Sequence, residues 1–145
     1  MERVLCILKP DAVIRELQPA IYSEIVSNNM KVEVVDKCRL LPGDIDFLYG
    51  HLRQNVVFDE IKAFMTCGAV EIFFVEGDEA LTKLESLVGS TDPAKASRGT
   101  IRGKYYSERR VLPQFPNIYQ NLIHSSNRER VQAELGYFLK DVKKG

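Results

Sequence analysis

The chain has 145 residues, of which 45% are hydrophobic and 28% are charged, and its 20 lysines and arginines balance 20 aspartates and glutamates. This length suits one hydrophobic core, so we expect a single domain over residues 1–145. A zero formal net charge argues against a nucleic-acid-binding protein, which normally carries a surplus of basic residues.

Cysteine usage and hydropathy indicate where the protein resides. The three cysteines, Cys6, Cys38 and Cys67, are widely spaced and odd in number, which predicts free thiols in a reducing compartment. No apolar stretch approaches the roughly 20 residues that span a bilayer, and Met1–Val4 does not begin a signal peptide. We therefore expect a cytosolic or nucleoplasmic protein with no membrane contact, and the location we assign is cytoplasmic.

The first half of the chain reads as two strands and two helices. Arg3–Leu8 is an apolar run that Pro10 ends, which indicates a buried strand. Proline in a first turn and apolar residues on one side predict a helix over Pro19–Asn28. Alternating residues predict a strand over Lys31–Leu41, and Asp44 can cap the helix that follows.

The second half adds two strands, three helices and one long irregular section, which glycine and proline punctuate. In chain order we expect a helix over Val57–Thr66, a strand over Ala69–Val75, a helix from Ala80 to Val88, an irregular section over Thr91–Ile118, a strand over Ile118–Ile123, a helix over Ser126–Leu139 and a polar tail over Asp141–Gly145.

This order contains two β-α-β halves in succession. That pattern predicts an α+β, ferredoxin-like βαββαβ fold, in which a four-stranded antiparallel sheet has helices packed on it, over one face.

One histidine stands out for chemistry. His124 lies in the stretch Asn121–Asn127, downstream of the cation-rich segment Pro93–Arg110. Neutral imidazole is a nucleophile near physiological pH, and one ring nitrogen can attack phosphorus while an acceptor holds the other. No P-loop glycine motif is present, so phosphate handling would need another scaffold. These observations suggest phosphoryl chemistry, and the alternative is a histidine with a purely structural role.

Five motifs occur in order along the chain. They are I-L-K-P-D-A-V (Ile7–Val13), F-M-T-C-G-A-V (Phe64–Val70), G-S-T-D-P-A-K-A (Gly89–Ala96), G-T-I-R-G (Gly99–Gly103) and N-L-I-H-S-S-N (Asn121–Asn127). In this arrangement the chain resembles the nucleoside diphosphate kinase family, whose ferredoxin-like fold agrees with the one read from the element order.

The resemblance implies a two-step exchange. A nucleoside triphosphate donates its γ-phosphoryl group to a histidine, and a nucleoside diphosphate then collects it. Mg²⁺ is the implied cofactor, because phosphate charge must be neutralised during transfer. The family also implies a homo-oligomer, a hexamer or a tetramer.

The resemblance assigns roles residue by residue. His124 matches the nucleophile, and Glu134, if one deletion is allowed before it, matches the carboxylate that orients the ring. Lys9 matches the lysine that neutralises phosphate charge, and Tyr49 matches a phenol close to the histidine. The implied nucleotide-binding residues are Lys9, Val57, Thr91, Arg102, Ile118 and Asn121, and Ser126 matches a serine two positions past the histidine.

The chain also departs from the family pattern. Val57 stands where the base clamp usually has an aromatic residue, which weakens nucleotide binding unless Phe58 takes over. Glu85 stands where an arginine usually assists the phosphates, unless Arg98 or a cation of the longer loop compensates. The longer loop is Lys104–Asn117, and its length is expected to alter assembly.

Ser125 and Asn127 replace a glycine and an aspartate of the family's histidine motif. Two interpretations therefore stay open: an active nucleoside diphosphate kinase, or a weakly active or inactive nucleotide-binding or assembly module on the same fold. The first is favoured, because the nucleophile and the phosphate-binding cations are all present.

Overall fold

Four strands form one antiparallel sheet, as predicted, and their order across it is β2-β3-β1-β4. The structure is a computed structural model that describes residues 1–144, with side chains described up to residue 139. The strands are β1 (Glu2–Leu8), β2 (Lys31–Arg39), β3 (Ala69–Gly77) and β4 (Ile123–Ser125). The α+β, ferredoxin-like prediction is confirmed.

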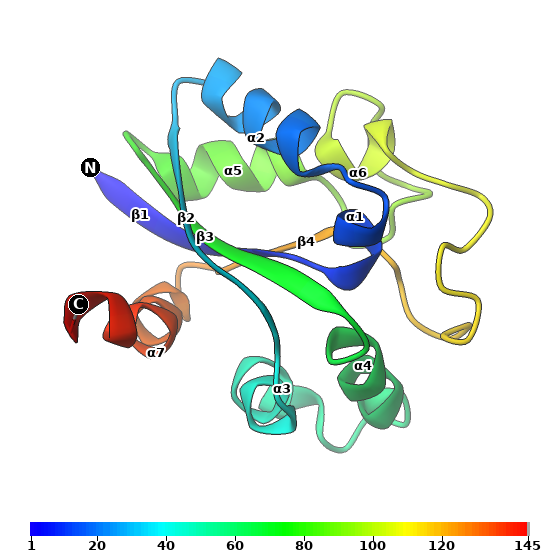
Figure 1. Cartoon of the computed structure of the whole chain (residues 1–145). Coiled ribbons are helices and arrows are strands. Elements are labelled where there is room, and N and C mark those ends of the chain that lie inside the picture. The colour runs from blue at the N-terminus through cyan, green and yellow to red at the C-terminus, as the bar shows by residue number, and fades with distance from the viewer. Residues whose placement is uncertain (145) are drawn as a thin grey trace.

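Helices cover both faces of this sheet, so the expectation that they cover one face was wrong (Figure 1). Successive β1 side chains point to opposite faces. Val4, Cys6 and Leu8 belong to one core cluster, whereas Leu5 and Ile7 belong to another. A continuous apolar strand needs cover on both sides.

The helices divide between these two layers. The first core includes side chains of α2 (Gln18–Ser27) and α5 (Ala80–Val88), and the second those of α3 (Pro42–Tyr49), α4 (Phe58–Met65) and α7 (Val131–Lys144). The remaining elements are α1 (Pro10–Ile14), the 3₁₀ helix η1 (Gly50–Leu52) and α6 (Ile101–Lys104).

Two short helices, α1 and α6, were not predicted. Lys9 is the N-cap of α1, and Pro10 pre-sets the backbone of its first turn. In α6 the hydroxyl of Thr100 accepts a hydrogen bond from the Gly103 N–H at 3.1 Å. A Cβ at Gly103 would lie 2.0 Å from the Ser97 carbonyl oxygen, so only glycine fits there. This turn places Arg102 beside β4.

The last strand lies later than predicted. We expected it over Ile118–Ile123, whereas β4 is Ile123–Ser125. Leu122 has a φ of +74°, which breaks the extended backbone just before the strand. The Ile118 carbonyl accepts a hydrogen bond from Arg110 instead of joining a strand ladder.

The final helix also begins later than predicted, at Val131, because Asn127 first opens a turn over residues 127–130, in which its side chain accepts from the Arg130 N–H at 2.9 Å. It then continues through Asp141–Lys144, where a polar tail was expected. Gly145 lies outside the described residues.

Two smaller predictions concern capping and cysteines. Asp44 caps α3 as expected, but from within the first turn, where it accepts from the Leu41 N–H at 2.8 Å. Cys6, Cys38 and Cys67 are free thiols, as predicted.

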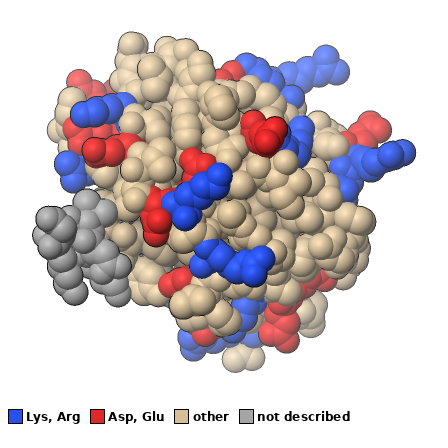
Figure 2. All heavy atoms as spheres, in the orientation of Figure 1, with Lys and Arg blue, Asp and Glu red and all other residues tan. Residues whose placement is uncertain are grey.

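The surface carries charges of both signs, interspersed on the face displayed in Figure 2, in keeping with the zero net charge. Within residues 1–144, no helix is long and apolar enough to cross a bilayer.

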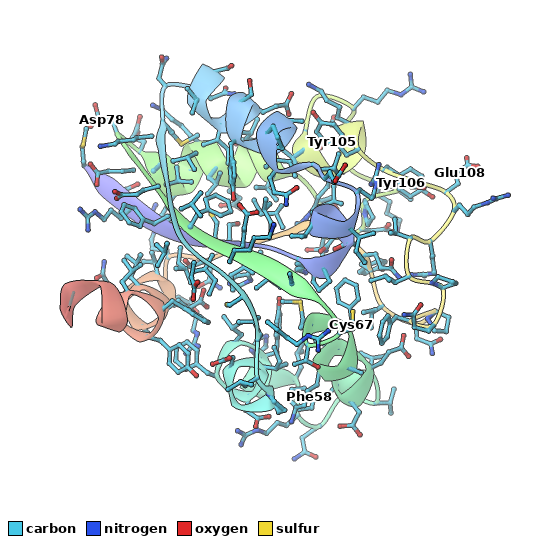
Figure 3. All side chains as sticks on the ribbon, viewed as in Figure 1. Phe58, Cys67, Asp78, Tyr105, Tyr106 and Glu108 are labelled. Atoms are coloured by element: carbon cyan, nitrogen blue, oxygen red, sulfur yellow. The ribbon has the colours of Figure 1, made fainter. Side chains whose placement is uncertain are left out.

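The long loop Lys104–Asn117 is held by side chains at its end and beyond it. The Gln120 amide accepts from the Leu112 N–H at 3.1 Å and donates to the Leu112 carbonyl at 2.7 Å. Asn117 donates to Glu60 of α4 from its backbone and its side chain. Figure 3 shows Tyr106 and Glu108 on this loop, away from the sheet. The end of the loop therefore lies against α4.

Candidate active site

His124 lies at the centre of β4 and faces the second core. Its partner on β1 is Ile7, a residue of that core, and cross-strand partners share a face. The His124 Nε2 atom lies 2.7 Å from Oε1 of Glu134, on α7. Glu134 is only 2% exposed, and the Tyr49 ring meets the imidazole edge to face at 5.9 Å between centroids. The structure thus brings three of the predicted catalytic residues together.

This contact determines which tautomer the neutral imidazole adopts. A carboxylate accepts hydrogen bonds, so Nε2 carries the proton and donates it to Glu134. The neutral ring then has its lone pair on Nδ1, which has no hydrogen-bond partner among the described residues. Nδ1 is therefore the ring nitrogen that is available to attack an electrophile. Burial and the nearby Glu134 raise the pKa of the Tyr49 phenol, so Tyr49 stays neutral.

A chain of hydrogen bonds joins the other predicted residues. Lys9 Nζ donates to Asn121 Oδ1 at 2.8 Å, and Asn121 Nδ2 donates to the Thr91 carbonyl at 2.8 Å. Lys9 and Asn121 are both buried. Burial first, and the positive charge of Arg102 second, lower the pKa of Lys9 to about 8, against an opposing effect of Asp11. This ammonium is a positive charge that lacks a full counter-charge, which suits an anionic ligand.

Arg102 has a structural task that the sequence did not predict. Its guanidinium donates to the carbonyl oxygens of Asn121 at 3.0 Å, Gly89 at 3.1 Å and Ile123 at 2.6 Å. A guanidinium has five N–H donors, so two are left for a ligand. Arg102 thus connects the end of α5 to the start of β4 while its charge stays beside Lys9.

An apolar cleft leads away from the Lys9 end of the site. This cleft has a volume of about 250 Å³ and is polar at one end, where Lys9, Thr91 and Asn121 lie. Its walls come from α4 and the residues before it on one side and from the end of the long loop on the other. The wall residues include Val57, Ile61, Ile118 and Tyr119. A flat apolar group fits between such walls.

Phe58 does not take the place of an aromatic residue in this cleft. It is 7% exposed and does not line the cleft, and Lys62 Nζ lies 5.0 Å from its ring centroid. Figure 3 labels Phe58 on α4. The prediction that Phe58 could compensate for Val57 is therefore wrong, because the first turn of α4 directs Phe58 into the protein.

A second, polar cleft of about 490 Å³ adjoins the first at Thr91, which lines both. Glu85, which the family resemblance matched to an arginine that assists the phosphates, lines this cleft. The cations that line it are Arg102 and Arg128, neither Arg98 nor a residue of the long loop. Compensation for the Glu85 charge therefore falls to Arg128, from the segment after β4.

Two further residues support the site. Asp11 is 1% exposed, and its Oδ2 accepts from the N–H of Leu122 at 3.1 Å, which holds this positive-φ residue two positions before His124. Sequence reasoning missed this role, although Asp11 lies in the same motif as Lys9. The Ser126 hydroxyl accepts from the Leu5 N–H and donates to the Leu5 carbonyl, both at 3.0 Å. Ser126 therefore fastens β4 to β1.

Comparisons with known proteins agree on one family. The family model described as nucleoside diphosphate kinase matches residues 2–143. The nucleoside diphosphate kinase of Nitrosospira multiformis is 33% identical over 143 residues, which are 98% of this chain and 95% of that protein. That of Burkholderia mallei is 32% identical over 143 residues, with the same coverage.

Solved structures give the same result. A halophilic nucleoside diphosphate kinase from Halobacterium salinarum, in complex with CDP, superposes with a TM-score of 0.83 at 28% identity, over 94% of this chain and 86% of that one. The apo enzyme from Encephalitozoon cuniculi superposes with a TM-score of 0.83 at 27% identity, over 96% of this chain and 89% of that one.

Proposed function

The chain belongs to the nucleoside diphosphate kinase family and is a phosphotransferase of that kind, and from this premise we propose that His124 carries the phosphoryl group between nucleotides. The observation that supports this role most directly is the 2.7 Å contact of its Nε2 with the buried Glu134, which leaves Nδ1 as the nucleophile.

The proposed reaction has two half-reactions. In the first, the Nδ1 lone pair forms a bond to the γ-phosphorus of a nucleoside triphosphate, the bond to the β,γ-bridging oxygen breaks, and the nucleoside diphosphate leaves. In the second, a terminal oxygen of another nucleoside diphosphate attacks the phosphorus and the N–P bond breaks. Nε2 keeps its proton throughout, and the Glu134 carboxylate stabilises the positive charge that develops on the ring.

The surrounding residues bind and orient the nucleotide. Lys9 and the two remaining N–H groups of Arg102 neutralise phosphate oxygens, and Arg102 offers them in a planar fork. Asn121 and Lys9 together present polar atoms to the ribose, and the apolar cleft receives the base between Val57 and Ile118. Apolar contact does not read donors and acceptors, so this cleft accepts all four bases.

Mg²⁺ is the proposed cofactor. Among the described residues, no three histidine, cysteine, aspartate or glutamate side chains gather to hold a metal. An ion here would therefore be coordinated mainly by phosphate oxygens, whose charge it neutralises when bound.

We also propose that the protein is cytoplasmic and forms a homo-oligomer, a hexamer or a tetramer. Val34 on the edge strand β2 is 48% exposed, and Leu41 just after that strand is 67% exposed. An exposed apolar sheet edge is a surface that proteins usually cover. Light scattering at several protein concentrations would measure the mass, and a monomer at all of them would contradict assembly.

The test of the function is a phosphoryl-exchange assay between unlike nucleotides. Wild-type protein mixed with ATP and GDP in the presence of Mg²⁺ is expected to yield GTP and ADP. The alternative, a nucleotide-binding or assembly module with weak or no transfer, is favoured by Glu85 and Val57. It predicts that ADP binds while GTP forms slowly or not at all, so the rate of GTP formation separates the two functions.

The charge of Lys9 predicts a pH dependence of nucleotide affinity. Its pKa is lowered to about 8 in the free protein, so Lys9 loses its proton as the pH rises past 8. Bound phosphate favours the charged form and raises this pKa, so binding takes up a proton. ADP affinity is expected to fall above pH 8, by at most about tenfold per pH unit. Calorimetric titrations from pH 7 to 10 measure this, and Lys9→Met should flatten the profile. The same pH dependence of ADP affinity in Lys9→Met would show that a group other than Lys9 causes it.

The position of Glu85 predicts a gain of affinity on charge reversal. Glu85 is exposed in the polar cleft beside Arg102, where its carboxylate repels phosphate. Glu85→Arg is expected to tighten ADP binding by about two- to fivefold, the size of an exposed ion pair. Ser86→Arg, which adds a charge one residue along α5 and outside the cleft, is the matched control. Equal affinities of the two variants would place Glu85 away from the bound phosphates.

A further inference from the structure

We propose that Tyr119, a residue of the long connection before β4, supplies the flat aromatic surface on which the nucleobase stacks. This inference rests on the proposed function and deepens it, because it names the residue that sets how strongly the base is held.

The aromatic residues that line the apolar cleft are Tyr49, Phe64 and Tyr119. The rings of Tyr49 and Phe64 already pack against other rings of the protein. Tyr49 packs edge to face on His124, and Phe64, 1% exposed, packs edge to face on Phe115 at 5.5 Å between centroids. Tyr119 is 53% exposed and has no ring partner among the described aromatic contacts. Tyr119 is therefore the aromatic residue of this cleft whose exposed ring is available to contact a ligand.

The wall that carries Tyr119 is fixed relative to the opposite wall. Asn117 donates from its backbone N–H to Glu60 Oε2 at 2.7 Å and from Nδ2 to Glu60 Oε1 at 3.0 Å. Glu60 lies on α4, next to the cleft residue Ile61. Arg110 also donates to the Ile118 carbonyl at 2.6 Å. The two bonds to Glu60 hold the walls at a set distance, and the Arg110 bond holds Ile118 in its own wall. The cleft is therefore formed before a nucleotide enters, and binding costs little conformational entropy.

Tyr119 also accounts for the missing aromatic residue at the opposite wall. Val57 offers a small apolar contact, and Phe58 points into the protein. A tyrosine ring beside Ile118 restores flat area from the other side of the same cleft. Its hydroxyl remains in water at the exposed rim, as is usual for tyrosine. A stack of this kind gains more from a purine than from a pyrimidine, because the purine has the larger ring area.

The test compares three single variants. Tyr119→Ala is expected to weaken ADP binding by about fivefold or more, the effect of losing one base–aromatic stack, with a smaller loss for CDP. Tyr119→Phe should keep the affinity, because the ring remains. Tyr106→Ala is the matched control, since Tyr106 is also exposed on the long loop but does not line the apolar cleft. Calorimetry gives the affinities, and exchange assays should show a raised KM with an unchanged kcat.

The outcomes separate this inference from the proposed function. ADP affinity of Tyr119→Ala equal to that of the wild type, or an equal loss in Tyr119→Phe, would overturn the stacking role. Because binding is measured without turnover, a wild-type protein that binds ADP but exchanges no phosphoryl group refutes the proposed function alone. In that case the alanine and phenylalanine variants still decide whether the base lies on Tyr119.

Discussion

His124→Ala is expected to lower kcat for phosphoryl exchange by about 10⁴-fold or more, the usual cost of removing a nucleophile. The reason is that both half-reactions pass through a bond between its Nδ1 and phosphorus. The variant should also fail to form a phosphoprotein with γ-labelled ATP, whereas wild-type protein should give one that is acid-labile and alkali-stable. Its ADP affinity should change little, because the cleft and Lys9 remain.

The second histidine provides the matched control. His51 is exposed, and its ring centroid lies 6.5 Å from that of Tyr49, so it is close to the site without contacting Glu134. His51→Ala should label like the wild type and keep its exchange rate. Labelling of His124→Ala at the wild-type level would show that the nucleophile is another residue.

Glu134→Gln is expected to lower kcat by about 100- to 10,000-fold with little change in KM. The buried carboxylate accepts from His124 Nε2 and so keeps Nδ1 unprotonated. A glutamine amide has no charge to stabilise the ring as its nitrogen becomes positive, and it allows the tautomer with the proton on Nδ1. The loss should therefore appear in the chemical step and not in binding.

Glu129→Gln is the control for the Glu134 variant. Glu129 is exposed in the turn before α7, so its substitution removes the same charge without touching the imidazole. Single-turnover phosphorylation of both variants by ATP measures the chemical step directly. A Glu134→Gln rate within twofold of the Glu129→Gln rate would mean that the carboxylate does not assist the histidine.

The sequence predicts the parts of this fold that have a clear periodicity. The first three strands and helices α2 to α5 lie within a few residues of their expected positions, since each repeats apolar residues over seven residues or more. The short helices α1 and α6 were not predicted because five and four residues are too few to show a helical periodicity. The start of β4 was misplaced because Leu122 adopts a left-handed backbone conformation. Leucine does not signal such a conformation, as glycine would.

The site depends on contacts that no local pattern reveals. Lys9 and Asn121 are 112 residues apart in the chain, and the sequence linked them only through a family resemblance. That resemblance named Glu134 only after one deletion was allowed. The resemblance could not reveal that three N–H groups of Arg102 donate to backbone carbonyl oxygens, because this depends on how the end of α5 meets β4.

The departures from the family pattern were visible, but their consequences required the structure. Val57 was recognised as a lost aromatic residue, yet Tyr119 went unnoticed because nothing in its neighbours indicates which cleft it lines. Its position follows from the hydrogen bonds that tie the preceding residues Asn117 to Glu60 and Ile118 to Arg110. Similarly, the proximity of Arg128 to Glu85 arises from the turn between β4 and α7.

The measurement that tests the central claim most directly is NMR of the phosphorylated, ¹⁵N-histidine-labelled protein. It identifies the nitrogen bonded to phosphorus through the ³¹P–¹⁵N coupling. We predict phosphorus on Nδ1 of His124 and a proton on Nε2, held by Glu134. Phosphorus on Nε2, on His51 or on no histidine at all would contradict the account.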